Sequence, residues 1–560
     1  MTIKKLAAVS ILLFIFISLT TSITMAEEIK RAPRFNFNTI EADKIIGQLG
    51  IFYPFANKES SLFYTDTRYR IDSDDVHEWN LGLGYRYKMK SGNKIGGIYL
   101  YKDRREEFNT NWDMWTIGGE IYTDKIDIRA NVYIADDKRV ENPSEDSLNI
   151  EDGKLIYQKS FYTSMDGIDF EIGKRWTETG SIFNNIGVYG RVFKFVEDDI
   201  ADMNGKEIRI NKLYGDRNGL YSKFGIKWRD DNLRGQNTEA TLSISLPFGK
   251  GKIKESKEKN IDKLEKRMTE QPVRDLDVVV AESNNKTSGN DGLKMIAHDP
   301  YTGQKIGNIY YITARGTGDG SKNNPTNIDY ALNNSKKNDI LILLGDNGDI
   351  FKNSIELKES QKLLSPGGHL RVSSGTEGSR KLTFKPTGKK ATLRGSNHLT
   401  DSGLVVLKNN NTISGLNLNN WSGHHAIHGF GIAGKTIITN NTLTTGNIDI
   451  LTKPNNSFGH SDVLISDNLI KENHNEAIKV QTVMGIKSKV EITKNTINRS
   501  KKSGILVSAN GQQTNYNYII NNNTIELSGE NGIDVNNTST EGKIDIRNNL
   551  IKESLGHGIK

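Results

Sequence analysis

The chain has 560 residues, which is long for one ordinary domain, so we expect at least two folded units joined by a linker. It contains no cysteine, which excludes disulfide scaffolds, cysteine-ligated zinc, iron–sulfur clusters and thiol catalysis. Its 75 basic and 68 acidic residues leave a net charge of +7 that is spread along the chain, so no nucleic acid is implied as a partner.

Residues 1–26 have the three parts of a secretory signal peptide. Lys4 and Lys5 give a positive start, residues 6–17 form an apolar run, and small residues lead up to Ala26. We therefore expect cleavage between Ala26 and Glu27, followed by a short N-terminal segment over residues 27–45. The alternative is a retained anchor, which would need about 20 apolar residues.

Residues 46–250 alternate apolar and polar side chains in segments of roughly 9–11 residues, the length with which a tilted strand crosses a bilayer. In the segment LGLGYRYKMK one face is apolar, whereas Arg86 and its polar neighbours lie on the other. A barrel in a membrane would turn the apolar face outward. The side chains that we expect to face lipid are Leu81, Leu83, Tyr85, Tyr87, Ile126, Ile128, Val132, Leu242, Ile244, Leu246 and Phe248.

Alternation alone also fits a soluble sandwich or small barrel with its apolar face inward. The aromatic residues favour the membrane: residues 46–250 contain five of the six tryptophans and 14 of the 20 tyrosines. Such enrichment is typical of the interfacial girdles of a membrane barrel. Counting segments from Ile46 predicts an antiparallel barrel of about twelve strands.

Residues 251–300 form a charged linker. Between Lys250 and Arg267 there are eight basic and four acidic residues, with apolar residues at helical spacing before Pro272. We expect a helix here, either as a solvated connector or inside or beneath the barrel pore, and then a short strand-like run, VRDLDVVV.

Residues 301–560 contain a repeat. The turn asparagines of the segments NNTL, DNLI, KNTI, NNTI and NNLI recur at a nearly constant period of about 27 residues. An aliphatic residue follows each one at a fixed offset, starting with Leu451 and Ile478. Stacked coils of this kind form a parallel β-helix with an aliphatic column and asparagine ladders at its corners. The predicted turn positions are Asn441, Asn468, Asn495, Asn523 and Asn549.

The segments GYRYKMKSGNKIGGIYLYKDRREEFNTNWDMWTIGGEIYTDKIDIRANVYI and YSKFGIKWRDDNLRGQNTEATLSISLPFGK resemble the β-domain of the inverse autotransporters, the intimin and invasin group. KLEKRMTEQPVRDLDVVV is similar to the segment that follows the barrel in that family. The resemblance implies a twelve-stranded outer-membrane barrel through which the C-terminal region reaches the cell surface. The passenger differs from the immunoglobulin-like domains of the best-known members and is similar to pectate-lyase-like right-handed β-helices.

A β-helix can be a polysaccharide lyase, a glycosidase or an adhesive rod, so the fold alone does not decide between catalysis and binding. GHG at residues 556–558 resembles one polygalacturonase motif, but only an isolated Asp534 stands where paired carboxylates are needed. GFGIAGKT at residues 429–436 fits a phosphate loop, although the β-branched residues after it predict a strand rather than the required helix. GTGDG at residues 316–320 is expected to be a turn.

His424, His425 and His428 form the densest histidine cluster. Imidazoles this close can bind a transition metal, but with no nearby carboxylate in the sequence we interpret the cluster as a solvated turn. We expect no catalytic, cofactor or metal site in the chain.

The sequence therefore predicts an all-β protein of the outer membrane: a transmembrane barrel of about twelve strands followed by a right-handed parallel β-helix exposed on the cell surface. We expect a non-enzymatic anchor and exporter whose passenger serves adhesion; the alternatives are a surface-displayed carbohydrate-active enzyme and a passive spacer. The expected partners are outer-membrane lipid, the barrel-assembly and periplasmic chaperone machinery, and a protein or glycan on a host surface. The chain ends inside a repeat at Lys560, so we expect either truncation or a cap.

Overall fold

The computed structural model describes residues 31–560 apart from 58–59, 90–92, 177–183, 199, 216–218, 249–263, 276, 284–292, 376–378, 396–402, 421–424, 453–458, 484–486, 511–514 and 538–541. The chain forms two compact units. One holds residues up to Glu145 together with Lys159–Leu293, and the other holds Asp146–Gln158 together with Lys294–Lys560. The expected signal peptide and its cleavage point lie outside the described residues. No helix in the described part is long and apolar enough to cross a membrane.

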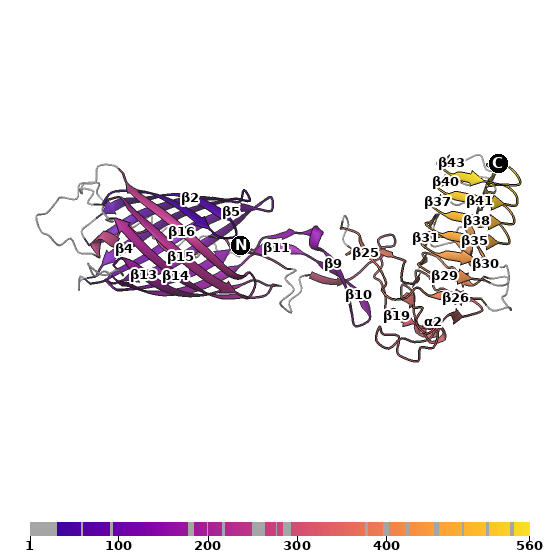
Figure 1. Cartoon of the computed structure of the whole chain (residues 1–560), viewed down its shortest axis with the longest axis horizontal. Coiled ribbons are helices and arrows are strands. Elements are labelled where there is room, and N and C mark those ends of the chain that lie inside the picture. Colours follow the sequence, from indigo (N-terminus) through magenta and orange to yellow (C-terminus); the bar gives the residue numbers. More distant parts are fainter. Residues whose placement is uncertain are drawn as a thin grey trace, which may run out of the picture. The chain divides into compact units, whose positions relative to one another are not determined.

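The first unit contains a closed antiparallel barrel of twelve strands, which confirms the predicted fold (Figure 1). Its strands range in length from 8 residues in β1 to 13 residues in β2, which suits a tilted crossing of a bilayer. The barrel strands are β1 (Arg34–Glu41), β2 (Ile45–Asn57), β3 (Ser61–Asp72), β4 (His77–Lys88), β5 (Ile95–Glu107), β6 (Thr110–Tyr122), β7 (Ile126–Ala135), β12 (Asp166–Trp176), β13 (Ile186–Val196), β14 (Met203–Gly215), β15 (Tyr221–Asp231) and β16 (Gly235–Pro247).

The barrel begins earlier than we expected. Strand β1 lies within residues 27–45 and closes the barrel by pairing with both β2 and β16. The sequence-based start at Ile46 was therefore wrong by one strand. The count of twelve still holds because residues 136–165, which lie inside the expected barrel range, leave the barrel between β7 and β12.

This insertion forms small sheets with the chain that follows the barrel. Strands β8 (Arg139–Glu141) and β11 (Phe161–Ser164) make a three-stranded sheet with β17 (Val280–Glu282). Strands β9 (Ser147–Glu151) and β10 (Lys154–Lys159) form a hairpin that makes a second such sheet with β18 (Leu293–Ile296). A 3₁₀ turn, η1 (Pro143–Glu145), separates β8 from β9. The hairpin belongs to the second compact unit, although barrel strands precede and follow it in the sequence.

The second unit is a parallel β-solenoid of short stacked strands (Figure 1). A single described α-helix, α2 (Ile328–Asn334), lies near its start. One face is formed by β19 (Ile309–Ile312), β20 (Ile340–Leu343), β23 (Lys362–Leu364), β28 (Thr412–Ser414), β31 (Gly434–Thr439), β34 (His460–Ser466), β37 (Lys487–Thr493), β40 (Asn515–Asn521) and β43 (Gly542–Arg547).

Two further parallel sheets complete the three-sided coils. The second face is formed by β21 (Ile350–Phe351), β26 (Thr392–Arg394), β29 (Asn417–Asn419), β32 (Thr442–Thr444), β35 (Leu469–Asn473), β38 (Thr496–Ser500), β41 (Thr524–Ser528) and β44 (Leu550–Lys552). The third face is formed by β22 (Ile355–Glu356), β27 (Val405–Val406), β30 (His425–Ile432), β33 (Asn447–Thr452), β36 (Ile478–Thr482), β39 (Ile505–Ala509) and β42 (Ile533–Asn537). A separate hairpin, β24 (Leu370–Val372) with β25 (Leu382–Phe384), lies outside the coils.

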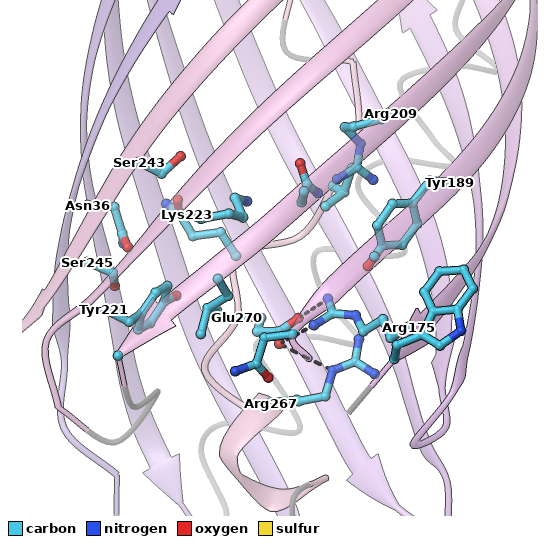
Figure 2. A pocket seen from close by; sticks show the side chains of 18 of the residues that line it. Asn36, Arg175, Tyr189, Arg209, Tyr221, Lys223, Ser243, Ser245, Arg267 and Glu270 are labelled. Carbon is cyan, nitrogen blue, oxygen red and sulfur yellow. Dashed lines mark hydrogen bonds and ion pairs between the residues drawn. The ribbon is translucent and has the colours of Figure 1, made fainter. Parts of the chain in front are cut away.

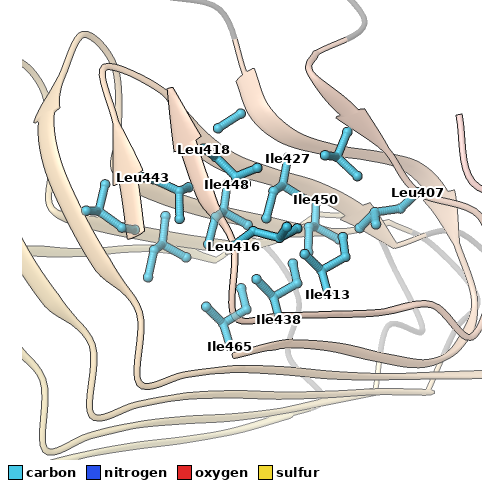
Figure 3. Close-up of a cluster of buried hydrophobic side chains, with 14 of the residues drawn as sticks. Leu407, Ile413, Leu416, Leu418, Ile427, Ile438, Leu443, Ile448, Ile450 and Ile465 are labelled. Carbon is cyan, nitrogen blue, oxygen red and sulfur yellow. The ribbon is translucent and has the colours of Figure 1, made fainter. Parts of the chain in front are cut away.

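Aliphatic side chains from all three faces fill the solenoid as one continuous column (Figure 3). On the third face Ile448, Ile478 and Ile505 stack in register, and none of them is exposed. The expected offset of Leu451 was wrong: it pairs with Gln481 and points outward, because the turn between β32 and β33 is shorter than the corresponding turns of later coils. Such a column cannot form in one coil alone, so the coils stabilise each other by stacking.

Candidate functional site: the barrel lumen and the segment that crosses it

The inner wall of the barrel is lined with paired charges. Arg86 Nε lies 2.6 Å from Glu120 Oε1, and neither side chain is exposed. Arg191 Nη2 lies 2.7 Å from Asp169 Oδ2, and Arg129 pairs with Glu171. These residues alternate along their strands with apolar outward side chains, so the period-two pattern places charge inside and hydrocarbon outside. A soluble barrel would show the reverse arrangement.

Glycines on the inner face make room for aromatic rings. A Cβ atom on Gly82 would lie 2.2 Å from the ring of Tyr101, and one on Gly84 would lie 2.1 Å from the ring of Tyr64. Both distances are far shorter than any tolerated contact. The repeated glycines of LGLGYRYKMK are therefore explained by tyrosines of the two neighbouring strands, whose rings lie over these glycines on the inner wall.

The segment that follows the barrel returns into the lumen. Its first described turn, η2 (Glu265–Arg267), places Arg267 Nη2 at 2.8 Å from Asp127. Two residues of the wall then hold Glu270: Arg175 donates to its carboxylate at 3.0 Å, and Arg86 donates to its backbone carbonyl at 2.5 Å. Of the expected helix over the linker, residues 250–263 lie outside the described part. The alternative in which this segment lies inside the pore is the one observed for residues 264–275 and 277–279.

Wall residues continue to pair with the segment farther along. Arg274 meets Asp103 at 2.5 and 3.0 Å, with both side chains fully buried, and its guanidinium lies 4.1 Å from the ring centre of Tyr101. Asp275 lies 3.2 Å from Arg191 and 3.5 Å from Arg229, and Asp277 pairs with Arg70. Each charge between Arg267 and Asp277 thus faces its opposite. We call residues 264–279 the lumen segment.

A cavity of about 300 Å³ remains beside the lumen segment (Figure 2). Its lining includes Tyr189, Arg209, Lys223 and the ion pairs that Arg175 and Arg267 form with Glu270. The lumen is therefore a polar space that is narrowed by the chain itself.

Where the lumen segment ends, the insertion between β7 and β12 covers it. Val278 and Val279 are buried among Phe161, Phe195 and Met203, and β17 then pairs with β11. Residues 136–165 gave no clear signal in the sequence, because strands this short match no transmembrane length.

The structure places the expected lipid-facing residues on the outside of the barrel. Seven of them are exposed: Leu81, Tyr87, Ile126, Val132, Leu242, Ile244 and Leu246. Leu83, Tyr85, Ile128 and Phe248 are half-buried. Phe248 also stacks on Phe35 of β1, with their ring centres 4.2 Å apart.

The five predicted turn asparagines form a ladder in the solenoid, in which the first four are buried and Asn549 is half-buried. Each Nδ2 donates to the Oδ1 of the next, at 3.1 Å from Asn441 to Asn468 and 2.9 Å from Asn523 to Asn549. The residue before each one adopts a left-handed conformation, with φ between 54° and 58° from Asn440 to Asn548. Asparagine and aspartate occupy four of these positions and are typical signals for a positive φ, so this feature could have been found from the sequence; only Lys494 is atypical.

The candidate enzymatic motifs of the solenoid have structural roles. Asp534 accepts a hydrogen bond from Asn531 at 2.8 Å, and the same asparagine accepts one from the backbone N–H of His557. GFGIAGKT consists of the end of β30, a turn and the start of β31, so no helix follows its glycines. GTGDG lies in the loop between β19 and α2, outside any helix or strand.

Comparisons with known families agree with this two-part architecture. Residues 22–146 match the inverse autotransporter β-domain, and residues 384–559 match the right-handed β-helix region. No curated protein matches the chain.

Solved structures are only distantly similar to parts of the chain. A membrane protein from a study of in-meso crystallization is 14% identical, with a TM-score of 0.34, over 45% of this chain and 100% of that one. The KdgM porin is 10% identical with a TM-score of 0.25, over 39% of this chain and 99% of that one. The β-domain of the Bordetella autotransporter BrkA is also 10% identical, with a TM-score of 0.23, over 39% of this chain and 99% of that one. Scores this low support no functional conclusion.

The fold and the lumen define a class of protein, an outer-membrane barrel that anchors and exports the chain that follows it. The chain carries an inverse autotransporter β-domain joined to a right-handed β-helix passenger, which is exposed at the cell surface.

Proposed function

We propose that the protein holds its β-helix permanently at the cell surface and uses it for adhesion to a host cell, another surface or a neighbouring cell. The observation that supports attachment over release is the lumen segment, whose charges from Arg267 to Asp277 are each paired with the wall. Removing one partner of such a buried pair costs about 3–5 kcal/mol. A chain held in this way remains fastened to its barrel.

The passenger suits contact with a protein or glycan. Its aliphatic core makes it a stiff rod, and its outer faces carry polar side chains interrupted by isolated exposed aromatic residues, of which Phe351 is 67% and Phe430 is 69% exposed. Aromatic rings with polar neighbours are favourable contact residues at interfaces. Asp534 is engaged by Asn531, which supports binding rather than acid–base chemistry at that end.

The proposal includes the membrane context. Cleavage after Ala26 would release the chain into the periplasm, where chaperones and the barrel-assembly machinery would receive it. The exposed belt that contains Leu81, Ile126 and Leu242 would face lipid.

Adherence of whole cells tests this function. Cells that display the full chain should adhere to epithelial monolayers or glycan surfaces about tenfold better than cells whose chain stops after Ser283, because many copies act together. Protease treatment of intact cells, followed with an epitope near Lys560, provides the control for display. Equal adherence of the two strains with display verified would contradict the proposal, and so would release of intact passenger into the medium.

A further inference from the structure

Two histidines and one aspartate converge on the third face of the solenoid. His425 and His428 lie on β30 and Asp449 on β33 of the next coil, and their ligand atoms all lie within 4.8 Å of one another. His425 Nδ1 is 3.8 Å from Asp449 Oδ2, and the two imidazole rings are stacked with centres 4.8 Å apart. The cluster is part of a strand, so its interpretation as a solvated turn was wrong. His424 lies outside the described residues.

A β-bulge explains why both histidines face outward. Side chains three residues apart in a regular strand point to opposite sides. Here the pairing of β30 with β33 shifts between His425 and Ile427, so that Ala426 and Ile427 are both buried in the core while both histidines remain on the outer face. Bulges of this kind redirect side chains and are common next to functional sites.

The polar atoms of the cluster are incompletely satisfied by the described protein. His428 Nδ1 is buried and has no hydrogen-bond partner there, and the same holds for Asn447 Nδ2. Asp449 is 8% exposed and supplies the carboxylate that the local sequence lacks.

We propose that His425, His428 and Asp449 bind one divalent transition-metal ion, with Zn²⁺ as the best match. Two imidazole nitrogens and one carboxylate oxygen are a common donor set for zinc, and three protein ligands leave a fourth position for water. Asn447 Oδ1 already lies 2.8 Å from His425 Nδ1 and helps to orient that ring. Tetrahedral bonds of about 2.0–2.1 Å require donors roughly 3.4 Å apart, so small side-chain rotations would close the site. Lys479 Nζ lies 3.2 Å from Asp449 and competes with the ion for the carboxylate.

The test is a Zn²⁺ titration of the full chain in detergent, without a histidine tag and against a colorimetric chelator. We expect one site, about tenfold or more weaker in His428→Ala and in Asp449→Asn. Lys479→Ala should bind more tightly, because the competing ammonium is gone. His474→Ala, which removes an exposed histidine of the same solenoid, is the matched control.

Cobalt provides a second measurement that does not depend on stability. Co²⁺ bound to the full chain should show the intense visible absorption of a tetrahedral site, and Asp449→Asn, which has nearly the same shape as the native residue, should abolish it. Binding that is unchanged in Asp449→Asn would overturn the proposal, and so would the absence of any zinc-dependent signal in the native chain at a large excess of metal.

A second, independent observation concerns the β9–β10 hairpin. Asp152 and Gly153 form its turn with φ values of 48° and 70°, and Gly153 accepts a hydrogen bond from the backbone N–H of Ile309 in the first solenoid strand at 2.7 Å. Leu155 and Tyr157 are fully buried against the outer side of the first coils, among residues that include Ile340 and Ile342.

We infer that this hairpin, which emerges between two barrel strands, is the template on which the passenger begins to fold after export. The outer side of the first coils is apolar, with Ile340, Ile342 and Leu364 buried there, and each solenoid repeat is stabilised by its neighbours, so the first coils need another surface to fold against. The hairpin covers their apolar outer side, and β18 adds to its edge before the first coil is made. Later coils can then stack one at a time on the coil before.

Surface protease resistance of the passenger tests the template. Tyr157→Ala should leave the barrel assembled, as judged by its heat-dependent gel mobility, but the passenger should gain protease resistance about tenfold more slowly after induction. Ile150→Ala, on the exposed side of the same hairpin, is the matched control and should behave as the native chain. Replacement of residues 147–158 by a flexible linker should leave the first coils protease-sensitive. Native resistance and native kinetics in both variants would overturn the inference.

Discussion

The barrel and the solenoid use the same period-two alternation with opposite results. In the barrel Arg86 and Glu120 are buried and Leu81 is 56% exposed, whereas in the solenoid Ile478 is buried and Lys479 beside it points outward. Alternation specifies two faces but does not specify which face is inside. The surroundings decide this, because a barrel surrounded by lipid must place its charges in the lumen, and a rod surrounded by water must enclose its hydrocarbon.

The largest expected effect comes from placing a charge in the aliphatic core of the solenoid. Ile478→Asp puts a carboxylate into the aliphatic column between Ile448 and Ile505, with no partner, at a cost of more than about 4 kcal/mol. The passenger should lose its thermal transition and its protease resistance on intact cells. The outward Gln481→Asp on the same strand is the control. Native resistance in Ile478→Asp would show that the column is less tightly packed than described.

Removing one charge of a buried ion pair in the lumen should open the barrel. Asp103→Ala leaves the Arg274 guanidinium buried and unpaired in the lumen, which should cost about 3–5 kcal/mol and loosen the lumen segment. Conductance of single barrels in planar bilayers should therefore rise. Asp113→Ala, which breaks the exposed pair with Arg104, should change stability by less than about 1 kcal/mol and leave conductance unaltered. If both variants conduct alike, the ion pairs do not hold the segment.

A smaller effect is expected in the asparagine ladder. Asn495→Ala removes hydrogen bonds to Asn523 and to the carbonyl of Ile465 and leaves their partners buried, so we expect a loss of about 1–3 kcal/mol and a lower melting temperature. Asn498→Ala, at an exposed position in the strand that follows, should have little effect. Equal melting temperatures of the two variants would mean that water replaces the ladder bonds.

The smallest effect is on pH dependence. Because burial holds the pKa of His428 below the ordinary value of about 6.5, the neutral imidazole contributes stability above that pH, and this contribution is lost as the pH falls through the lowered pKa. The group is partly exposed, so the change should be below about 1 kcal/mol. Thermal melts of the metal-free chain from pH 8 to pH 5 should fall less steeply in His428→Gln. An identical slope would assign the dependence to other groups.

Much of the fold could be predicted because its signals are local and repeated. The outward residues from Leu81 to Leu246 follow from alternation, and the ladder positions from Asn441 to Asn549 follow from spacing. The start of the barrel at Arg34 was missed, since β1 is short and lies in the segment that we expected to be a short N-terminal stretch before the barrel. The hairpin at residues 147–158 was missed because its partners, such as Ile309 and Ile340, lie far away in the chain.

The sequence by itself determined the two kinds of architecture, since a repeated period of two or of about 27 residues dictates which side chains share a face. Only the tertiary structure decided what those faces meet. It places Asp103 beside Arg274 and Asp449 beside His428. The β9–β10 hairpin, which lies between two barrel strands in the sequence, packs in the solenoid unit. The physical reason is that an ion pair, a metal-ligand set or a covering hairpin depends on distances in space. Strand pairing and stacking set these distances between segments that are far apart in the sequence, so no local sequence pattern reveals them.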